Sequence, residues 1–469
     1  MPSGQRSKSY LLWLGAVLGA FLFSRIVYFL MGVRFDATPI TYYRQYADPE
    51  LLRTHLLQTV YYLHSQPPLF NLFLGIVLKL FPSHYPAAFA AIYFMLGLVF
   101  TLTIFHLLRR VGVSNAVSAG LTVIFIVNPG LVLFENWLFY TYPLAVLLSL
   151  CALFLHRFLS RETMKDAVVF FGLLGAVVLS RGVFHLFWFI AVSLLIFAIK
   201  RTARNKILVA CLIPFAIVVA AYVKNYVVFH VMSMGEIYAK QNLADVAVES
   251  VPKEMLKELV DRGDIVLISK VPTFSPVSSY KKYITPLQTG IPVLDQEIKS
   301  TKANNFQNLA YLQIADLYFK DALVIIKSHP KLFLQKLVRN YREWYFRPFA
   351  DVWPFNNNNR NHGQLCALEI KYNMMVYGKF GKDNAGLFLL FGLPILMIYL
   401  IVRMPFAFFR KPSDLTLGTT LLFMFMTMTM THVAILCAWE HNRIRFMIDS
   451  YYLALLGLLI RNRFLRLFR

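Results

Sequence analysis

The chain has 469 residues, of which 58% are hydrophobic and 16% aromatic. A soluble protein of this length could not bury so much apolar surface, so the composition predicts an all-α polytopic membrane protein. The net charge of +23 does not indicate nucleic-acid binding, because most lysines and arginines lie in short loops beside apolar segments, where they set membrane topology.

The first apolar segment, residues 10–33, follows Arg6 and Lys8 and is too long for a signal-peptide core, so we expect a retained transmembrane helix. Nine more apolar segments are predicted spans: 86–108, 115–133, 137–156, 167–180, 183–199, 207–228, 384–402, 416–438 and 447–460. One further apolar run, 69–81, would cover only about 20 Å as a helix, less than the hydrocarbon core.

The basic residues decide whether this short run crosses the membrane. Every basic cluster beside a predicted span is cytoplasmic only if 69–81 stays on the outer side, so we expect it to be an interfacial helix, with 48–63 as a second one. The prediction is ten spans with both ends inside. Residues 1–229 form a membrane module with a first outer loop at 34–85, residues 230–383 form a soluble outer segment, and 384–469 hold the last spans.

The outer segment contains many prolines and charges, and it is too long for a plain connector. Residues 306–318 and 330–345 have helical periodicity, and the asparagine run 356–359 is typical of a loop tip.

Acidic, aromatic and amide side chains crowd into the first outer loop. Asp36, just after the first span, is the expected general base, although a solvated loop carboxylate is the alternative. Asp48 is the second candidate acid, and its position also suits the start of a helix. The candidate substrate-binding residues of this loop are Tyr42, Tyr43, His64 and Gln66.

Other candidates follow at the expected outer ends of later spans. Glu135 is an acid at the membrane edge, which is costly unless it is exposed or partnered. Lys224 either reaches toward the interface or contacts substrate. An Arg443-x-Arg445 pair on an outer turn suits a phosphate. The remaining candidates are Arg181 for phosphate and His185 and Glu440 for substrate.

Several signals are absent from the sequence. There is no glycine-rich phosphate loop and no zinc-type spacing, so we expect neither a nucleotide cofactor nor a metal. The charged residues lie at the ends of apolar segments rather than within them, which disfavours an ion-coupled transporter.

Together these residues resemble the GT-C integral-membrane glycosyltransferases, above all their bacterial protein mannosyltransferases and aminoarabinose transferases. The resemblance rests on Asp36, the His-Ser-Gln-Pro-Pro-Leu box at 64–69, Asn128-Pro129 leading to Glu135, Lys224-Asn225-Tyr226, and Glu440 with Arg443 and Arg445. Many members carry two adjacent acids after the first span, whereas Ala37 follows Asp36 here, so the choice between Asp36 and Asp48 stays open.

The resemblance implies transfer of a sugar from a polyprenyl-phosphate donor to a hydroxyl of a lipid, glycan or protein acceptor, with inversion, on the outer face of a bacterial plasma membrane. Asp36 would act as base, and Arg443, Arg445, Lys224 and Arg181 would bind the donor phosphate. The alternatives are a flippase for lipid-linked sugars and a scaffold whose outer segment binds a partner.

Overall fold

The structure, a computed structural model, describes residues 3–266, 270–285, 287–341, 343, 362–377, 414–436 and 442–460. In these ranges the regular elements are all helical, and the only strand-like features are two isolated backbone bridges. The predicted all-α class is therefore confirmed for the described chain.

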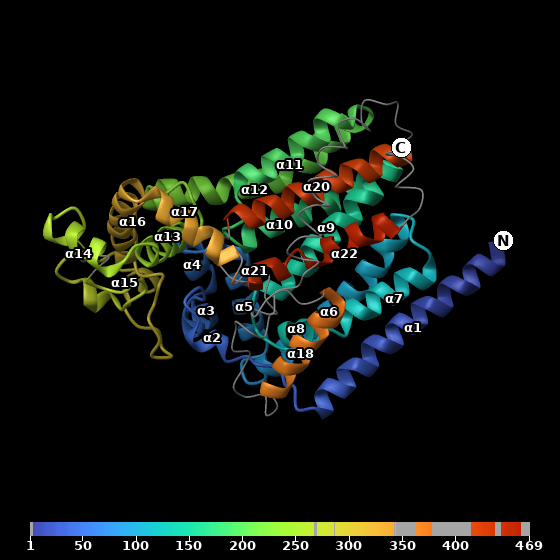
Figure 1. The fold of residues 1–469 in the computed structure, drawn as a ribbon, viewed down its shortest axis with the longest axis horizontal. Coiled ribbons are helices and arrows are strands. Elements are labelled where there is room, and N and C mark those ends of the chain that lie inside the picture. The colour runs from blue at the N-terminus through green and yellow to red at the C-terminus, as the bar shows by residue number, and fades with distance from the viewer. Residues whose placement is uncertain are drawn as a thin grey trace.

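Apolar helices pack side by side into a bundle (Figure 1). They are α1 (Ser3–Leu30), α6 (Tyr85–Arg110), α7 (Asn115–Ile126), α8 (Pro129–Glu135), α9 (Thr141–Arg161), α10 (Met164–Ser180), α11 (Leu186–Ile199), α12 (Arg204–Phe229), α20 (Asp414–Leu436) and α22 (Asp449–Ile460). Two short polar helices, η1 (Arg201–Ala203) and α21 (Asn442–Phe446), lie between them.

Four helical stretches in the described chain are long and apolar enough to cross a membrane, and the bent pair α7–α8 makes a fifth if it is one span. Each predicted span that falls on described residues coincides with a helix or helix pair, whereas 384–402 lies outside them. Helices α10, α11 and α22 have 17, 14 and 12 residues. Because a perpendicular crossing takes about 20 residues, ten spans remain a prediction.

Two predicted spans have different boundaries in the structure. Span 115–133 is broken by a 67° bend, because Pro129 lacks an N–H and the Asn128 side chain accepts a hydrogen bond from Gly130 N at 2.8 Å, which starts α8. Span 137–156 begins as a helix only at Thr141. The residues before Thr141 are extended and pair with the first loop.

The basic loops within the described residues gather at one end of the bundle, whereas those at 403–411 and 461–469 lie outside these residues. Lys200 Nζ lies 2.7 Å from Glu162 Oε1, which joins the α9–α10 turn to the α11–α12 turn. The Arg109 guanidinium lies 4.4 Å from the centroid of the Tyr10 ring, so the end of α6 is beside the start of α1. Because α1 and α6 both run the length of the bundle, the chain leaves α1 and enters α6 at the opposite end. Residues 31–84 therefore begin and finish at the same end of the bundle, opposite the basic loops.

This stretch contains four short helices: α2 (Pro39–Tyr42), α3 (Pro49–Thr54), α4 (Leu56–Tyr61) and α5 (Pro68–Leu80). We call residues 31–67 the first loop. The single interfacial helix expected over 48–63 is wrong, because the backbone breaks at His55 and gives two helices, α3 and α4. The helix expected over 69–81 is confirmed as α5, with 13 residues.

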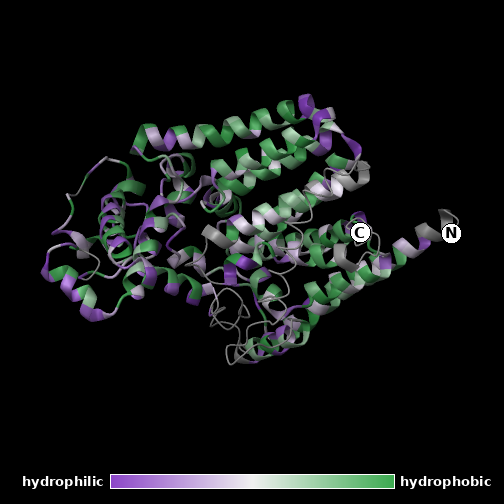
Figure 2. Ribbon diagram, turned by 45° about the horizontal axis from the view of Figure 1, so that its top comes forward, coloured by the Kyte–Doolittle hydropathy of each residue, from purple (hydrophilic) through white to green (hydrophobic). Residues whose placement is uncertain are grey.

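Residues 230–341, here called the polar segment, have a hydrophobic core of their own, separate from that of the bundle. Their helices are α13 (Glu236–Ser250), α14 (Lys253–Asp261), η2 (Val277–Tyr280), α15 (Pro292–Asp295), α16 (Ala310–Ser328) and α17 (Pro330–Asn340). Hydrophilic residues are frequent on these helices, whereas the bundle is largely hydrophobic (Figure 2). In Figure 1 the polar segment lies at the end of the molecule away from the N-terminus.

The two helices expected in this segment are present with shifted ends. Helix α16 begins at Ala310 rather than 306, because Asn308 Oδ1 accepts a hydrogen bond from Ala310 N at 2.9 Å. Helix α17 is described to Asn340, and the asparagine run 356–359 lies outside the described residues. Helix α18 (His362–Tyr377), expected to be part of the outer segment, packs against α8 of the bundle.

A tight turn at residues 298–304, the clamp turn, joins the polar segment to the first loop. Ser300 donates from its amide to Asp48 Oδ2 at 2.6 Å and from its hydroxyl to Asp48 Oδ1 at 2.5 Å. Lys299 Nζ donates to the Tyr43 carbonyl at 2.8 Å. These bonds fix two parts of the chain that are more than 250 residues apart.

Candidate functional site

Two predicted phosphate-binding arginines converge on one tyrosine. Arg443 Nη1 donates a hydrogen bond to the Tyr140 hydroxyl, and the Arg181 guanidinium lies 4.5 Å from the centroid of the Tyr140 ring. Arg181 Nη1 also donates to Gln66 Oε1 at 3.4 Å. Gln66, Arg181 and Arg443 are each at most 6% exposed. We call Gln66, Tyr140, Arg181 and Arg443 the arginine cluster.

Local structure explains how these residues meet. Helix α10 ends at Ser180, and Arg181 is extended, with φ −148° and ψ 127°, so its side chain leaves the helix axis. Helix α21 carries Arg443 and is held against α8 by Phe446, whose ring stacks on Phe134 with centroids 4.2 Å apart. Tyr140 lies directly before α9, in the turn that follows the extended residues.

Asp36 reaches the same region through backbone pairing. Its amide donates to the Asn136 carbonyl at 2.8 Å, and its carbonyl accepts from Leu138 N at 2.8 Å. Leu138 and Tyr140 are two residues apart, which corresponds to at most roughly 7 Å of chain. The pairing therefore holds the backbone of Asp36 against the residues that lead to Tyr140.

The two candidate acids have different surroundings. Asp36 Oδ1 accepts from the Thr38 amide at 2.9 Å and from the Thr38 hydroxyl at 2.6 Å, while Oδ2 has no hydrogen-bond partner in the described chain. Asp48 uses both oxygens on Ser300, and Oδ1 also accepts from Glu50 N, which caps α3. The expectation that Asp48 starts a helix is confirmed.

The His-Ser-Gln-Pro-Pro-Leu box lies where the first loop, the bundle and the polar segment meet. His64 Nε2 is 2.9 Å from the Gln307 carbonyl, and its ring packs on Phe229 with centroids 4.9 Å apart. Burial, aided by the nearby Lys224 charge and opposed by the hydrogen bond to Gln307, lowers the pKa of His64 to about 4. Lys224 Nζ donates to the Leu63 carbonyl at 2.7 Å, so this cation also supports the loop backbone.

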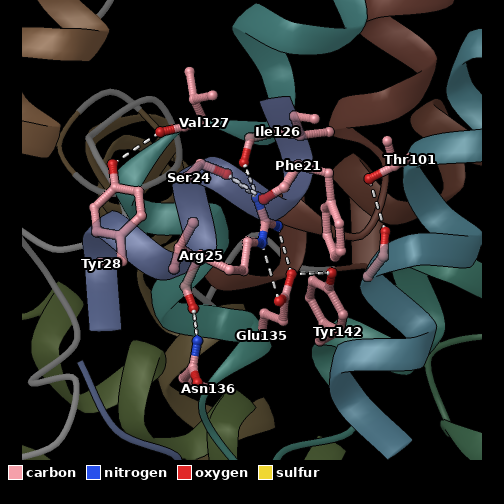
Figure 3. Close-up of polar contacts among 12 residues, drawn as sticks. Phe21, Ser24, Arg25, Tyr28, Thr101, Ile126, Val127, Glu135, Asn136 and Tyr142 are labelled. Carbon is pink, nitrogen blue, oxygen red and sulfur yellow. Dashed lines mark hydrogen bonds and ion pairs between the residues drawn. The ribbon is translucent and has the colours of Figure 1, made fainter. Parts of the chain in front are cut away.

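Glu135 is paired with Arg25, which is not among the predicted site residues. Arg25 of α1 contacts both carboxylate oxygens, with Nη2 2.5 Å from Oε2 and Nε 3.1 Å from Oε1 (Figure 3). The Tyr142 hydroxyl donates to Oε2 at 2.8 Å, and Arg25 Nη1 donates to the Ile126 carbonyl at 2.8 Å. This network ties α1 to the bent pair α7–α8 and to α9.

The expectation that charged residues lie only at the ends of the apolar segments is wrong, because Arg25 lies within α1. It lies five residues before the end of α1, about 7.5 Å along the helix axis. An arginine inside an apolar stretch is itself a signal, since a buried charge needs a partner. Asp449, inside the predicted span 447–460, carried the same signal, whereas Tyr140 carried none.

The remaining candidates are spread around the arginine cluster. Arg445 pairs with Asp449, with Nε 3.3 Å from Oδ1, at the start of α22. Tyr43 packs edge-on against Phe139 with centroids 4.4 Å apart, whereas Tyr42 is 53% exposed. His185 precedes α11, and Glu440 lies outside the described residues. Among described side chains, no group of three or more His, Cys, Asp or Glu residues is arranged to hold a metal ion.

Gly97 of α6 makes room for the Glu135 carboxylate. A Cβ at this position would lie 2.6 Å from Oε2 and 3.0 Å from the Tyr142 hydroxyl. We therefore expect Gly97→Ala to displace the buried ion pair, cost about 1–3 kcal/mol and lower the melting temperature by several degrees. Gly120→Ala is the matched control, since no described atom lies within 4 Å of its Cβ position. Equal melting temperatures for the two variants would contradict this packing.

The buried His64 predicts acid sensitivity. Its folded-state pKa of about 4 is below the ordinary value of 6.5, so the neutral ring contributes stability above pH 6.5 that is lost as the pH falls toward 4. The shift corresponds to at most about 3 kcal/mol. Between pH 7 and 4.5 the melting temperature of the wild type should fall more steeply than that of His64→Gln. Parallel curves would show that His64 does not titrate on unfolding.

The chain matches no protein-family model, no curated protein and no solved structure in these comparisons. The function of the protein must therefore be inferred from its residues and their geometry. The resemblance to GT-C glycosyltransferases remains an expectation from short motifs.

Proposed function

We propose that the protein is an integral-membrane glycosyltransferase that moves a sugar from a polyprenyl-phosphate donor to an acceptor hydroxyl. The observation that carries the proposal is the convergence of Arg181 and Arg443 on Tyr140, with the backbone of Asp36 paired to the residues that lead to Tyr140. Guanidinium groups suit a phosphate, and a carboxylate with an unused oxygen suits proton removal.

The proposed membrane placement follows from the basic end of the bundle. With that end in the cytoplasm, the first loop and the polar segment face outward, as in a GT-C layout with ten spans. Helix α5 then lies on the outer leaflet, because 13 residues are too few to cross and the chain returns to its starting end. In this proposal the membrane is a bacterial plasma membrane, and the polyprenyl-phosphate sugar is bound at its outer face.

In the proposed reaction the acceptor oxygen attacks the anomeric carbon while the bond from this carbon to the phosphate oxygen breaks. Asp36 Oδ2 takes the hydroxyl proton, and the leaving lipid phosphate keeps the electron pair. Arg443 and Arg181 stabilise the negative charge that develops on this phosphate. Arg445, paired with Asp449, supports the turn that carries Arg443. A single displacement inverts the anomeric centre.

The decisive experiment follows detergent-purified protein incubated with radiolabelled polyprenyl-phosphate sugars. Transfer of label to an acceptor, with release of the lipid phosphate, supports the enzyme. In vesicles, movement of the labelled lipid between leaflets with neither product would support the flippase and overturn the proposal.

Replacing the base tests the proton-transfer step. Asp36→Asn keeps the shape of the side chain and loses its basicity, so transfer should fall at least about a hundredfold with donor binding retained. Asp48→Asn should lose less in the chemical step, because Asp48 holds the clamp turn. A larger chemical loss in Asp48→Asn would move the base to that residue.

The phosphate role predicts a graded response at Arg443. Arg443→Ala should reduce transfer at least about tenfold, since a charge-assisted hydrogen bond is worth about 1.5–3 kcal/mol. Arg443→Lys should restore activity only in part, because an ammonium lacks the planar fork. Arg53→Ala, at an exposed ion pair with Glu50, is the control and should be neutral. Full activity in Arg443→Ala would remove this residue from the mechanism.

A further inference from the structure

A polar cavity of about 550 Å³ opens between the first loop and the polar segment. The first loop contributes Tyr42 and Arg44, and the polar segment contributes Asp245, Phe274, Lys302 and Asn304. Its volume lies within the roughly 300–1,000 Å³ of small-molecule sites, and such sites often form where two parts of a fold meet. None of these residues takes part in the chemistry proposed above.

Arg44 presents donors to this cavity in a fixed orientation. Its guanidinium stacks over the Phe274 ring, with Cζ 4.1 Å from the centroid, and makes no hydrogen bond within the described chain. The backbone is held as well, because the Arg44 carbonyl accepts from the Tyr238 hydroxyl at 2.7 Å. Stacking uses the face of the guanidinium and leaves its N–H edge available.

Asp245 supplies an acceptor to the same cavity. The Thr273 hydroxyl donates to Oδ1, and Oδ2 has no hydrogen-bond partner within the described chain. Burial raises the pKa of Asp245, and the Arg44 charge opposes this effect. No ion pair closes the gap between Arg44 and Asp245, so a donor and an acceptor face the cavity together.

The rim of the cavity is rigid where it is formed by the clamp turn. Lys302 has a φ of +68°, and the bonds of Ser300 to Asp48 and of the Thr301 hydroxyl to the Thr41 carbonyl hold the turn on the first loop. Asn304, able to donate and accept, closes the turn through a bridge to Ile298. The backbone that carries Lys302 and Asn304 is therefore pre-organised.

We propose that this cavity binds a short saccharide. Sugar hydroxyls both donate and accept, which matches a cavity lined by Arg44, Lys302 and Asn304 together with the Asp245 carboxylate. The C–H face of a sugar ring packs on an aromatic side chain, and the Tyr42 ring is 53% exposed at the rim. A simple phosphate would leave this ring unused and would be repelled by Asp245.

That the saccharide is the acceptor rests on the proposed glycosyl transfer, whereas its binding does not. The clamp turn that forms the rim also bonds to Tyr43, which packs on Phe139 beside the arginine cluster. A glycan held in the cavity would thus extend along the first loop toward Asp36.

The test is direct binding of fluorescently labelled full-length protein in detergent to an array of defined neutral and uronic-acid oligosaccharides, without donor. We expect the wild type to bind at least one of them. Arg44→Ala and Asp245→Asn should each weaken this binding at least tenfold. Arg262→Ala is the matched control, since this exposed arginine pairs with Asp264 outside the cavity, and its binding should be unchanged.

Lys302→Asn guards against a folding effect, because asparagine tolerates the left-handed backbone and replaces the long cationic side chain by a short neutral one. It should also weaken binding, with an unchanged melting temperature. Wild-type binding to no oligosaccharide, or unchanged binding in Arg44→Ala and Asp245→Asn, would overturn the site. Saccharide binding without sugar transfer would support the saccharide site and contradict the proposed glycosyltransferase activity. Sugar transfer without saccharide binding would support the activity and contradict the site.

Discussion

The hydrogen bonds between Asp48 and Ser300 are the interaction on which the arrangement of this protein depends. One carboxylate caps α3 through Glu50 N and holds the amide and the hydroxyl of Ser300. Hydrogen bonds to a charged acceptor are stronger than neutral ones, and this acceptor is 2% exposed. The same side chain therefore begins a local helix and fixes a segment 252 residues away.

The first loop consequently serves as a platform that is held from two sides. On the bundle side, Asp36 pairs with the extended residues before α9, and Gln66 contacts Arg181. On the other side, His64 and Asp48 bind the polar segment. The proposed chemistry and the proposed saccharide site thus share one rigid support, which suits a reaction between a substrate in the membrane and one outside it.

Local features of the fold could be predicted from the sequence. Apolar length located the helices of the bundle and α5, and Asp48 marked the start of α3. The basic loops lie together, as their pattern required. The predicted helix boundaries were wrong where a segment distant in the sequence bonds to the chain. The span expected from residue 137 starts late because Asp36 holds Leu138 in an extended backbone.

The candidate site could be predicted only in part, for the same reason. Arg181, Gln66 and Arg443 were recognised singly, but Tyr140, which joins them, is an ordinary aromatic residue in the sequence. Arg25 and Glu135 are 110 residues apart, and their pairing depends on the bend at Pro129. Contacts of this kind are set by packing in three dimensions, which residue type and spacing along the chain do not specify.

The most direct test of the account is hydrogen exchange at the clamp turn. In full-length protein in detergent, the Ser300 amide should exchange slowly in the wild type and in Glu50→Ala, whose side chain lies on the exposed face of α3. In Asp48→Ala the Ser300 amide should exchange much faster, since the carboxylate that accepts its hydrogen bond is gone. A fast-exchanging Ser300 amide in the wild type, or no change in Asp48→Ala, would contradict the claim that this carboxylate fixes the polar segment on the first loop.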